Sequence, residues 1–176
     1  MDSITHICSG ILLGRGLRPL AAVRRTMLLV AGLAALAPDV DSVSYLWRSD
    51  TFFRLHHTYT HTLVGLVVVA LAAIESRWLK NLSFARLLGI NQGGGGLHLC
   101  GDMIALWSLR ILWPFSDHDF VHKWTSDFDY AVPAVVVVAT GLSETDGFQH
   151  CAPWIIAGAF LLLVVYFLFI PGWGAA

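Results

Sequence analysis

The sequence predicts an all-α integral membrane protein, a helical bundle of about six segments that forms one domain over residues 1–176. Two observations predict this class. Hydrophobic residues make up 56% of the chain and charged residues only 13%, whereas about a quarter of the residues in a typical soluble domain are charged. The mean hydropathy is +0.67, and the apolar residues occur in runs that polar stretches separate, as in a membrane protein with several helices.

Three apolar segments are predicted in the first half of the chain. Residues 4–14 form a short apolar segment, and residues 26–37 form a second one that Pro38 closes. From residue 39 to residue 61 the chain is mixed and polar. Residues 62–74 form the first strongly hydrophobic helix, so the predicted helices of this half flank a long polar connection.

Three further segments are predicted in the second half, at residues 84–109, 131–142 and 154–170, with a polar stretch at 110–130. The first of them contains four consecutive glycines, Gly93 to Gly96. Each glycine costs about 1 kcal/mol in a helix interior. We therefore expect these glycines to break or sharply bend the helix, or to let a neighbouring backbone come very close.

The charge and the cysteines exclude some classes of function. The net charge of −1 leaves no strongly basic surface, so nucleic acid is not an expected partner. Cys8, Cys100 and Cys151 are scattered and lack a CxxC spacing. We interpret them as buried small residues rather than as a disulfide framework or a thiolate metal site.

Basic residues predict the orientation of the bundle. If the helices alternate in direction, the connections at 15–25 and 75–86 share one side, which carries more Lys and Arg than the other. The first side carries Arg15, Arg18, Arg24, Arg25, Arg77, Lys80 and Arg86, and the opposite side carries Arg48, Arg54, Arg110 and Lys123. The positive-inside rule makes the first side cytoplasmic, so the polar stretches at 39–61 and 110–130 are expected to face outward.

The histidines and carboxylates that could carry chemistry all fall on the predicted outward side, at or near the ends of segments. They are His6, Asp39, Asp41, His56, His61, His98, Asp102 and Asp129. Each also has a simpler interpretation: His6 alone could be an interfacial histidine, and Asp39 and Asp41 could be solvated residues after a helix stop. His57 would point away from His56 on a helix, so we expect it at the surface or in a supporting position.

His98 and Asp102 are the least easily explained as ordinary residues. Their i, i+4 spacing places both on one helix face within an apolar segment. Ionisable residues inside a membrane are costly and face a partner or a polar cavity. A hydrogen bond between these two side chains is the simpler alternative to metal binding.

Imidazoles and carboxylates without thiolates are ligands that suit zinc, manganese or iron. The number of candidates is enough for one to three ions. Such a site can activate water at neutral pH and clamp a phosphoryl oxygen, which predicts a metal-dependent hydrolase. Asp41 or Asp129 is the expected general base that deprotonates the attacking water.

The chain also resembles the YdjM-like family of LexA-regulated, membrane-bound, metal-dependent hydrolases. The resemblance rests on five stretches in the family's order, "THICSG", "APDVDS", "HHTYTHT", "HLCGD" and "ILWPFSD". It implies a helical metal site, distantly like the fold of the zinc phospholipase C and P1 nuclease group. The implied ligands are His6, Asp39, Asp41, His56, His61, His98 and Asp102, and Asp129 in "TSDFDY" matches a later acidic residue. His57 stands where the family usually has Arg, and Thr62 where it has Ser.

We therefore expect a multi-pass protein of the inner membrane with a zinc-type centre at its outer interface. Its expected substrate is a phosphoester such as a phospholipid or a lipid-linked phosphate, and membrane lipids are its expected partners. Two alternatives remain open. The same residues could bind or transport a divalent ion near the bilayer midplane, where broken glycine-rich helices often form such sites, or the metal could simply pin short helices together.

Overall fold

The computed structural model describes residues 1–17, 21–47, 50, 52, 56–75, 82–105, 108–122 and 129–169. These residues form six α-helices, which confirms the predicted all-α class and segment number. The helices are α1 (Ser3–Gly16), α2 (Arg24–Leu36), α4 (Leu63–Glu75), α5 (Phe84–Ile104), α6 (Ala131–Glu144) and α7 (Ala152–Phe169), and two 3-10 helices, η1 (Ala37–Leu46) and η3 (Gln149–Cys151), accompany them. Among the described residues the only extended pairing is an isolated bridge between Leu109 and Phe120.

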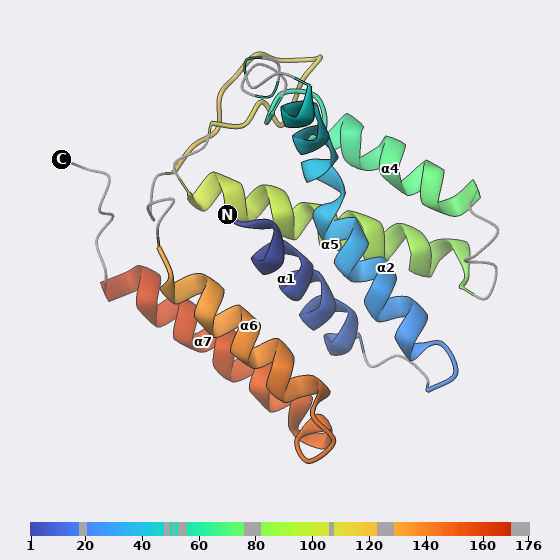
Figure 1. Cartoon of the computed structure of the whole chain (residues 1–176), viewed down its shortest axis with the longest axis vertical. Helices are drawn as coiled ribbons and strands as arrows, with labels where there is room; N and C mark the ends of the chain where they lie inside the picture. Colours follow the sequence, from blue (N-terminus) through green and yellow to red (C-terminus); the bar gives the residue numbers. More distant parts are fainter. Residues whose placement is uncertain are drawn as a thin grey trace.

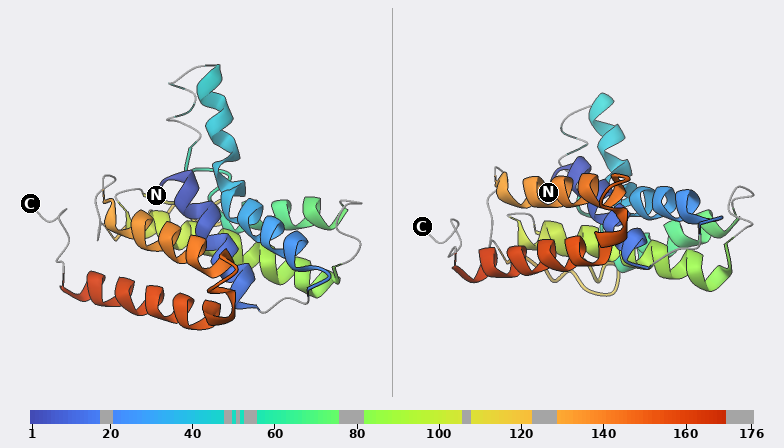
Figure 2. Two further views of the ribbon diagram at one scale, coloured as in Figure 1. Left: turned by 60° about the horizontal axis from the view of Figure 1, so that its bottom comes forward. Right: turned by 90° about the horizontal axis from the view of Figure 1, so that it is seen from below.

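Helix α1 lies in the middle of the bundle and contacts α2, α5, α6 and α7. Helix α4 packs on α5, and α6 and α7 form an antiparallel pair joined by η3 (Figure 1). The η1 segment continues from α2 and projects away from the other helices (Figure 2). The apolar core accordingly consists of separate patches, one between α2 and α5 and another between α1, α6 and α7.

Helix α5 runs without interruption through Gly93 to Gly96, so the expectation of a break or sharp bend is wrong. The alternative, close approach of a neighbour, is confirmed. A Cβ atom on Gly94 would lie 3.0 Å from Ala31 O and 3.0 Å from Ala35 N, both backbone atoms of α2. In α1, a Cβ atom on Gly10 would lie 2.2 Å from Ala31 O. Close packing of backbones offsets the low helix propensity of glycine.

Pro38 does not end the helical path, although a polar connection is predicted after it. Helix α2 ends at Leu36, and Pro38 lies at the start of η1, where its missing N–H group costs no hydrogen bond. The η1 helix also exposes apolar side chains, including Leu46 at 80%. Asp39 and Asp41 are consequently held on a helical turn rather than in a polar loop.

Two helical segments, Arg24–Leu46 and Gln149–Phe169, are long and apolar enough to cross a membrane, by length and composition. Leu63–Ala72 and Ala131–Glu144 are shorter apolar helices. The described part of the chain therefore supports a membrane protein, while a bundle in which all six segments cross the bilayer stays a prediction.

The three cysteines are free thiols, as expected. The expectation that all three are buried is wrong for Cys100, which is exposed on α5. Cys8 and Cys151 are half-buried.

Candidate metal centre

The candidate ligands meet because four helix ends converge. His6 lies in the first turns of α1, Asp39 follows the end of α2, and His61 stands two residues before α4. His98 and Asp102 occupy the last two turns of α5. These ends gather on the side of the bundle that carries the loops at the top of Figure 1.

Two imidazole nitrogens and two carboxylate oxygens lie close together here: His61 Nε2, His98 Nε2, Asp39 Oδ1 and Asp102 Oδ2. The two Nε2 atoms are 3.0 Å apart, and Asp39 Oδ1 lies 3.6 Å from each of them. Asp102 Oδ2 lies 3.5 Å from His61 Nε2 and 3.0 Å from His98 Nε2. Ligand atoms about 2.0–2.1 Å from a tetrahedral zinc ion are about 3.3–3.5 Å apart. Asp39, His61 and His98 form a group that could hold one metal ion, and Asp102 Oδ2 lies beside both imidazole nitrogens.

The protonation pattern also fits a cation. His98 Nδ1 lies 2.7 Å from the carbonyl oxygen of Ala35 and donates its proton there, so the Nε2 lone pair faces the centre. Asp102 Oδ2 is buried and lacks a hydrogen-bond partner among the described residues. A lone pair and a carboxylate oxygen that face each other inside a protein require a proton or a metal ion between them.

Asp41 lies behind the histidines rather than among the four converging atoms. Its Oδ1 is 2.8 Å from His56 Nδ1, and its Oδ2 accepts from Thr60 Oγ1 at 2.7 Å. Thr60 Oγ1 in turn lies 3.0 Å from His61 Nδ1, so Asp41 reaches His61 through this hydroxyl. A carboxylate on Nδ1 fixes the orientation of an imidazole whose Nε2 binds metal. The geometry thus supports an orienting position for Asp41, which the sequence had placed among the ligands.

His61 experiences opposing influences on its protonation. Burial lowers the pKa of His61, but the carboxylates of Asp39, Asp41 and Asp102 outweigh burial and raise it above its ordinary value. A proton on His61 therefore competes with a metal ion for the same site.

A second group of possible ligand atoms consists of His56, His57 and His61, which offer nitrogens within 4.8 Å of one another. His57 is only 8% exposed, so a surface position for it is excluded. Its Nε2 lies 3.8 Å from Asp102 Oδ2. Burial, together with His61 and His56, lowers the pKa of His57 to about 3, so this imidazole is neutral at physiological pH.

The sequence-based placement of His57 assumed helical geometry between His56 and His61. Residues 56–62 instead form turns, and His57 has a φ of 67°. This left-handed conformation is uncommon outside glycine, although His adopts it more readily than most residues. Helical periodicity in the sequence therefore could not predict the buried position of His57.

His6 contacts two of the candidate ligands, Asp102 and His98. Its Nε2 lies 3.1 Å from Asp102 Oδ1, and its ring stacks on His98 with centroids 3.7 Å apart. The amino group of Met1 lies 2.6 Å from the same Asp102 oxygen. His6, His98 and Asp102 together form another group that could hold an ion.

Residues 1–174 match the family described as YdjM inner membrane protein. The chain belongs to this family. The family places it in the inner membrane, in agreement with its two candidate spans. Neither the curated proteins nor the solved structures compared with the chain include a match, so the likeness to the zinc phospholipase C and P1 nuclease fold stays a prediction.

In this YdjM family protein, Asp129 is not brought to the centre. Its Oδ1 accepts from the backbone N of Ala131 at 2.9 Å, and its Oδ2 accepts from the hydroxyl of Tyr166 at 2.6 Å. Both carboxylate oxygens therefore tie the start of α6 to α7. Asp129 also belongs to none of the groups of described residues that could hold a metal ion.

The "ILWPF" stretch supports the loop that carries His61, a role that the sequence did not reveal. The backbone N of Leu63 donates to Ile111 O at 3.0 Å, and Trp113 packs edge-on against Tyr59 with ring centroids 4.9 Å apart. Thr62 Oγ1 accepts from Gly65 N at 2.9 Å and so caps the start of α4. These contacts fix the backbone on both sides of His61.

Proposed function

We propose that this YdjM family protein is a divalent-metal-dependent hydrolase of the inner membrane. Its proposed substrate is a phosphoester of a phospholipid or of another lipid-linked phosphate at the outer interface. The observation that carries the proposal is the buried set of imidazole nitrogens and carboxylate oxygens at metal-ligand spacing. When bound, a divalent ion would supply Lewis-acid polarisation of the phosphoryl oxygen and would make water acidic enough to lose a proton near neutral pH.

His61, His98, Asp39 and Asp102 are the proposed ligands of the first ion. Two imidazoles and two carboxylates without thiolate suit zinc, and also manganese or iron. The Ala35 carbonyl holds the Nδ1 side of His98, and Thr60 Oγ1, which itself donates to Asp41, holds the Nδ1 side of His61. These contacts keep each Nε2 directed at the ion.

The Asp41–His56 pair is the proposed base. Asp41 Oδ1 holds the Nδ1 proton of His56 at 2.8 Å, so the basic nitrogen is Nε2, as in other carboxylate–histidine pairs. In a protein with one ion, His56 Nε2 would take the proton of the attacking water. In a protein with two ions, His56 would instead join His57 as a ligand of the second ion, and the number of ions per chain separates these mechanisms. Both carboxylate oxygens of Asp129 accept hydrogen bonds elsewhere. Of the two aspartates expected as the base, Asp41 is therefore the one that we propose, acting through His56.

The proposed outward orientation of the site is supported by charges at the opposite end of α1. Arg15 and Arg24 lie there, 3.3 Å and 3.8 Å from the carboxylate of Glu144. With this end in the cytoplasm, the metal site faces outward. Several residues of the charge count lie outside the described residues: Arg18, Arg48, Arg54, Arg77, Lys80 and Lys123. A multi-pass arrangement of the remaining helices is part of the same proposal.

The test uses the full chain in nanodiscs. We expect bound divalent metal and metal-dependent hydrolysis of phospholipids or of bis(p-nitrophenyl) phosphate. His61→Ala and Asp102→Ala should lose both, whereas His150→Ala, at an exposed histidine of η3, should lose neither. Metal binding without turnover of any phosphoester would refute the hydrolase and favour the transport or structural alternatives. A protein that binds no metal would refute all three.

A further inference from the structure

An apolar cavity of about 290 Å³ lies between α1, α5, α6 and α7. Its walls are apolar except at four residues, Thr5, His6, Ser9 and Cys100. The volume is close to the lower end of ligand pockets, about 300 Å³. The cavity is therefore large enough for one extended apolar group.

The polar end of this cavity borders the metal site through His6. His6 lines the cavity, while its Nε2 lies 3.1 Å from Asp102 Oδ1 and its ring stacks on His98. Gly101 also lines the cavity, and a Cβ atom there would lie 3.3 Å from His6 Cε1. The nearest atom to that Cβ would be Met1 Sδ at 2.7 Å, so the absence of a side chain at Gly101 lets Met1 pack beside the imidazole.

The apolar end is formed partly by α7, one of the two segments that could cross a membrane. Phe160 and Val164 line the cavity and are 70% and 36% exposed. Val132 and Val136 of α6 form a buried part of the wall. The cavity consequently connects the hydrocarbon-facing surface of α7 with His6.

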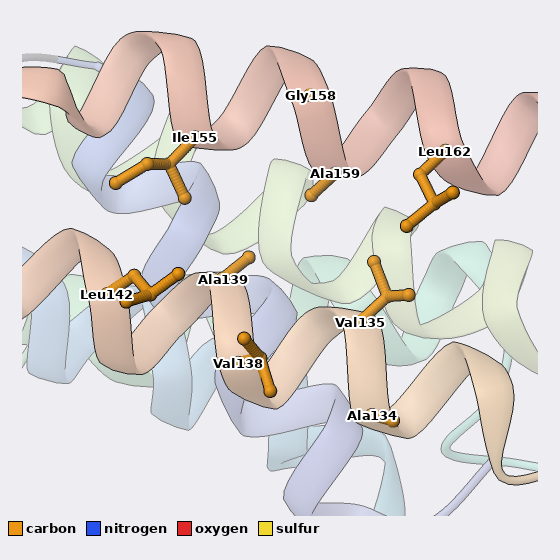
Figure 3. A pocket seen from close by; sticks show the side chains of 9 residues that line it. All are labelled: Ala134, Val135, Val138, Ala139, Leu142, Ile155, Gly158, Ala159 and Leu162. Atoms are coloured by element: carbon orange, nitrogen blue, oxygen red, sulfur yellow. The ribbon is translucent and has the colours of Figure 1, made fainter.

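A larger groove of about 460 Å³ runs along α6 and α7 (Figure 3). Apolar residues of these two helices alone line it, among them Val135, Val138 and Leu162. It includes no residue of the metal centre. The smaller cavity is therefore the one that can place an apolar group against the chemistry.

We propose that the cavity binds one hydrocarbon chain of a membrane lipid, with the phosphate of that lipid beside His6. The substrate role rests on the proposed hydrolase function, whereas binding of the chain can be measured without turnover. The small volume admits one chain, so a two-chain lipid would leave its second chain in the bilayer. The contact with α7 provides an entry route from the membrane that avoids water.

The test compares two neighbouring valines of α7. Val164 lines the cavity, whereas Val165 does not, and their exposed fractions are 36% and 42%. The probe is dodecyl phosphate with a photoreactive diazirine at its terminal carbon, added to metal-loaded protein in phosphatidylcholine nanodiscs. Val164→Trp should lower labelling of the cavity-lining residues about tenfold, the factor for about two methylene groups no longer buried. Val165→Trp should leave labelling unchanged.

Leu97→Trp, on the α5 wall, provides a second cavity-filling variant at a residue that is already 41% exposed. Bound metal per chain checks that each variant is folded.

Equal labelling in Val164→Trp, Leu97→Trp and Val165→Trp would overturn the inference. If labelling falls as expected but no phosphoester is hydrolysed, the hydrolase proposal fails and the binding site for a hydrocarbon chain stands. If all three variants hydrolyse bis(p-nitrophenyl) phosphate and dodecyl phosphate esters equally well, the proposed binding site for a hydrocarbon chain fails and the hydrolase proposal stands.

Discussion

Replacing Gly94 by alanine tests whether the close contact between α2 and α5 builds the metal site. A Cβ atom at Gly94 would lie 3.0 Å from Ala31 O and Ala35 N, and 3.1 Å from the side chain of Ala34. Backbone atoms cannot rotate away, so the two helices must separate. The carbonyl of Ala35, which accepts the Nδ1 proton of His98 at 2.7 Å, would move with α2.

Gly96 provides the matched control, because no atom lies within 4 Å of a Cβ placed there. Each substitution gains about 1 kcal/mol of helix propensity. Overpacking typically costs about 1–3 kcal/mol, so we expect Gly94→Ala to destabilise the protein by up to about 2 kcal/mol. Gly96→Ala should stabilise it by up to about 1 kcal/mol. Loss of the Ala35 contact should also weaken metal binding about 10- to 100-fold in Gly94→Ala alone.

The assay is unfolding of the detergent-solubilised protein with and without metal, together with a competition titration of metal affinity. The expected pattern is opposite signs for the two stability changes and a loss of affinity in one variant. Equal stability and equal affinity for Gly94→Ala and Gly96→Ala would refute the reasoning, because the steric difference between the two sites would then have no consequence.

Three further predictions concern the centre itself. His98→Ala should abolish stoichiometric metal binding, measured by elemental analysis, and binding retained at the wild-type level would exclude His98 as a ligand. Asp41→Asn should weaken binding about 10- to 100-fold without abolishing it, as expected of an orienting carboxylate, and complete loss would instead make Asp41 a ligand. Because Asp39 and Asp41 raise the pKa of His61, metal affinity should fall as the pH falls through that raised pKa. Asp41→Asn should shift this loss to lower pH in an affinity titration between about pH 5 and pH 9, and an unchanged profile would contradict the assignment.

The sequence by itself determined where the helices lie and which polar residues were candidate metal ligands. Apolar runs and helix-end residues are local signals, so five of the six segments were placed within about two residues of their observed bounds, and the exception, predicted at 84–109, ends at Ile104. The i, i+4 relation of His98 and Asp102 is likewise local and was predicted directly. The glycine run was ambiguous, since propensity opposes a helix there and only the neighbour at Ala31 and Ala35 decides the outcome.

Only the tertiary structure decided the position and the contacts of each polar side chain. It brought His61 Nε2 and His98 Nε2 together, placed Asp41 against Nδ1 of His56, and tied Asp129 to Tyr166 instead. It also buried His57 and opened a cavity beside His6. The physical reason is that ligand geometry depends on angstrom-scale distances between residues that are up to 96 positions apart. Such distances are set by how closely whole helices pack, and no short stretch of sequence contains that information.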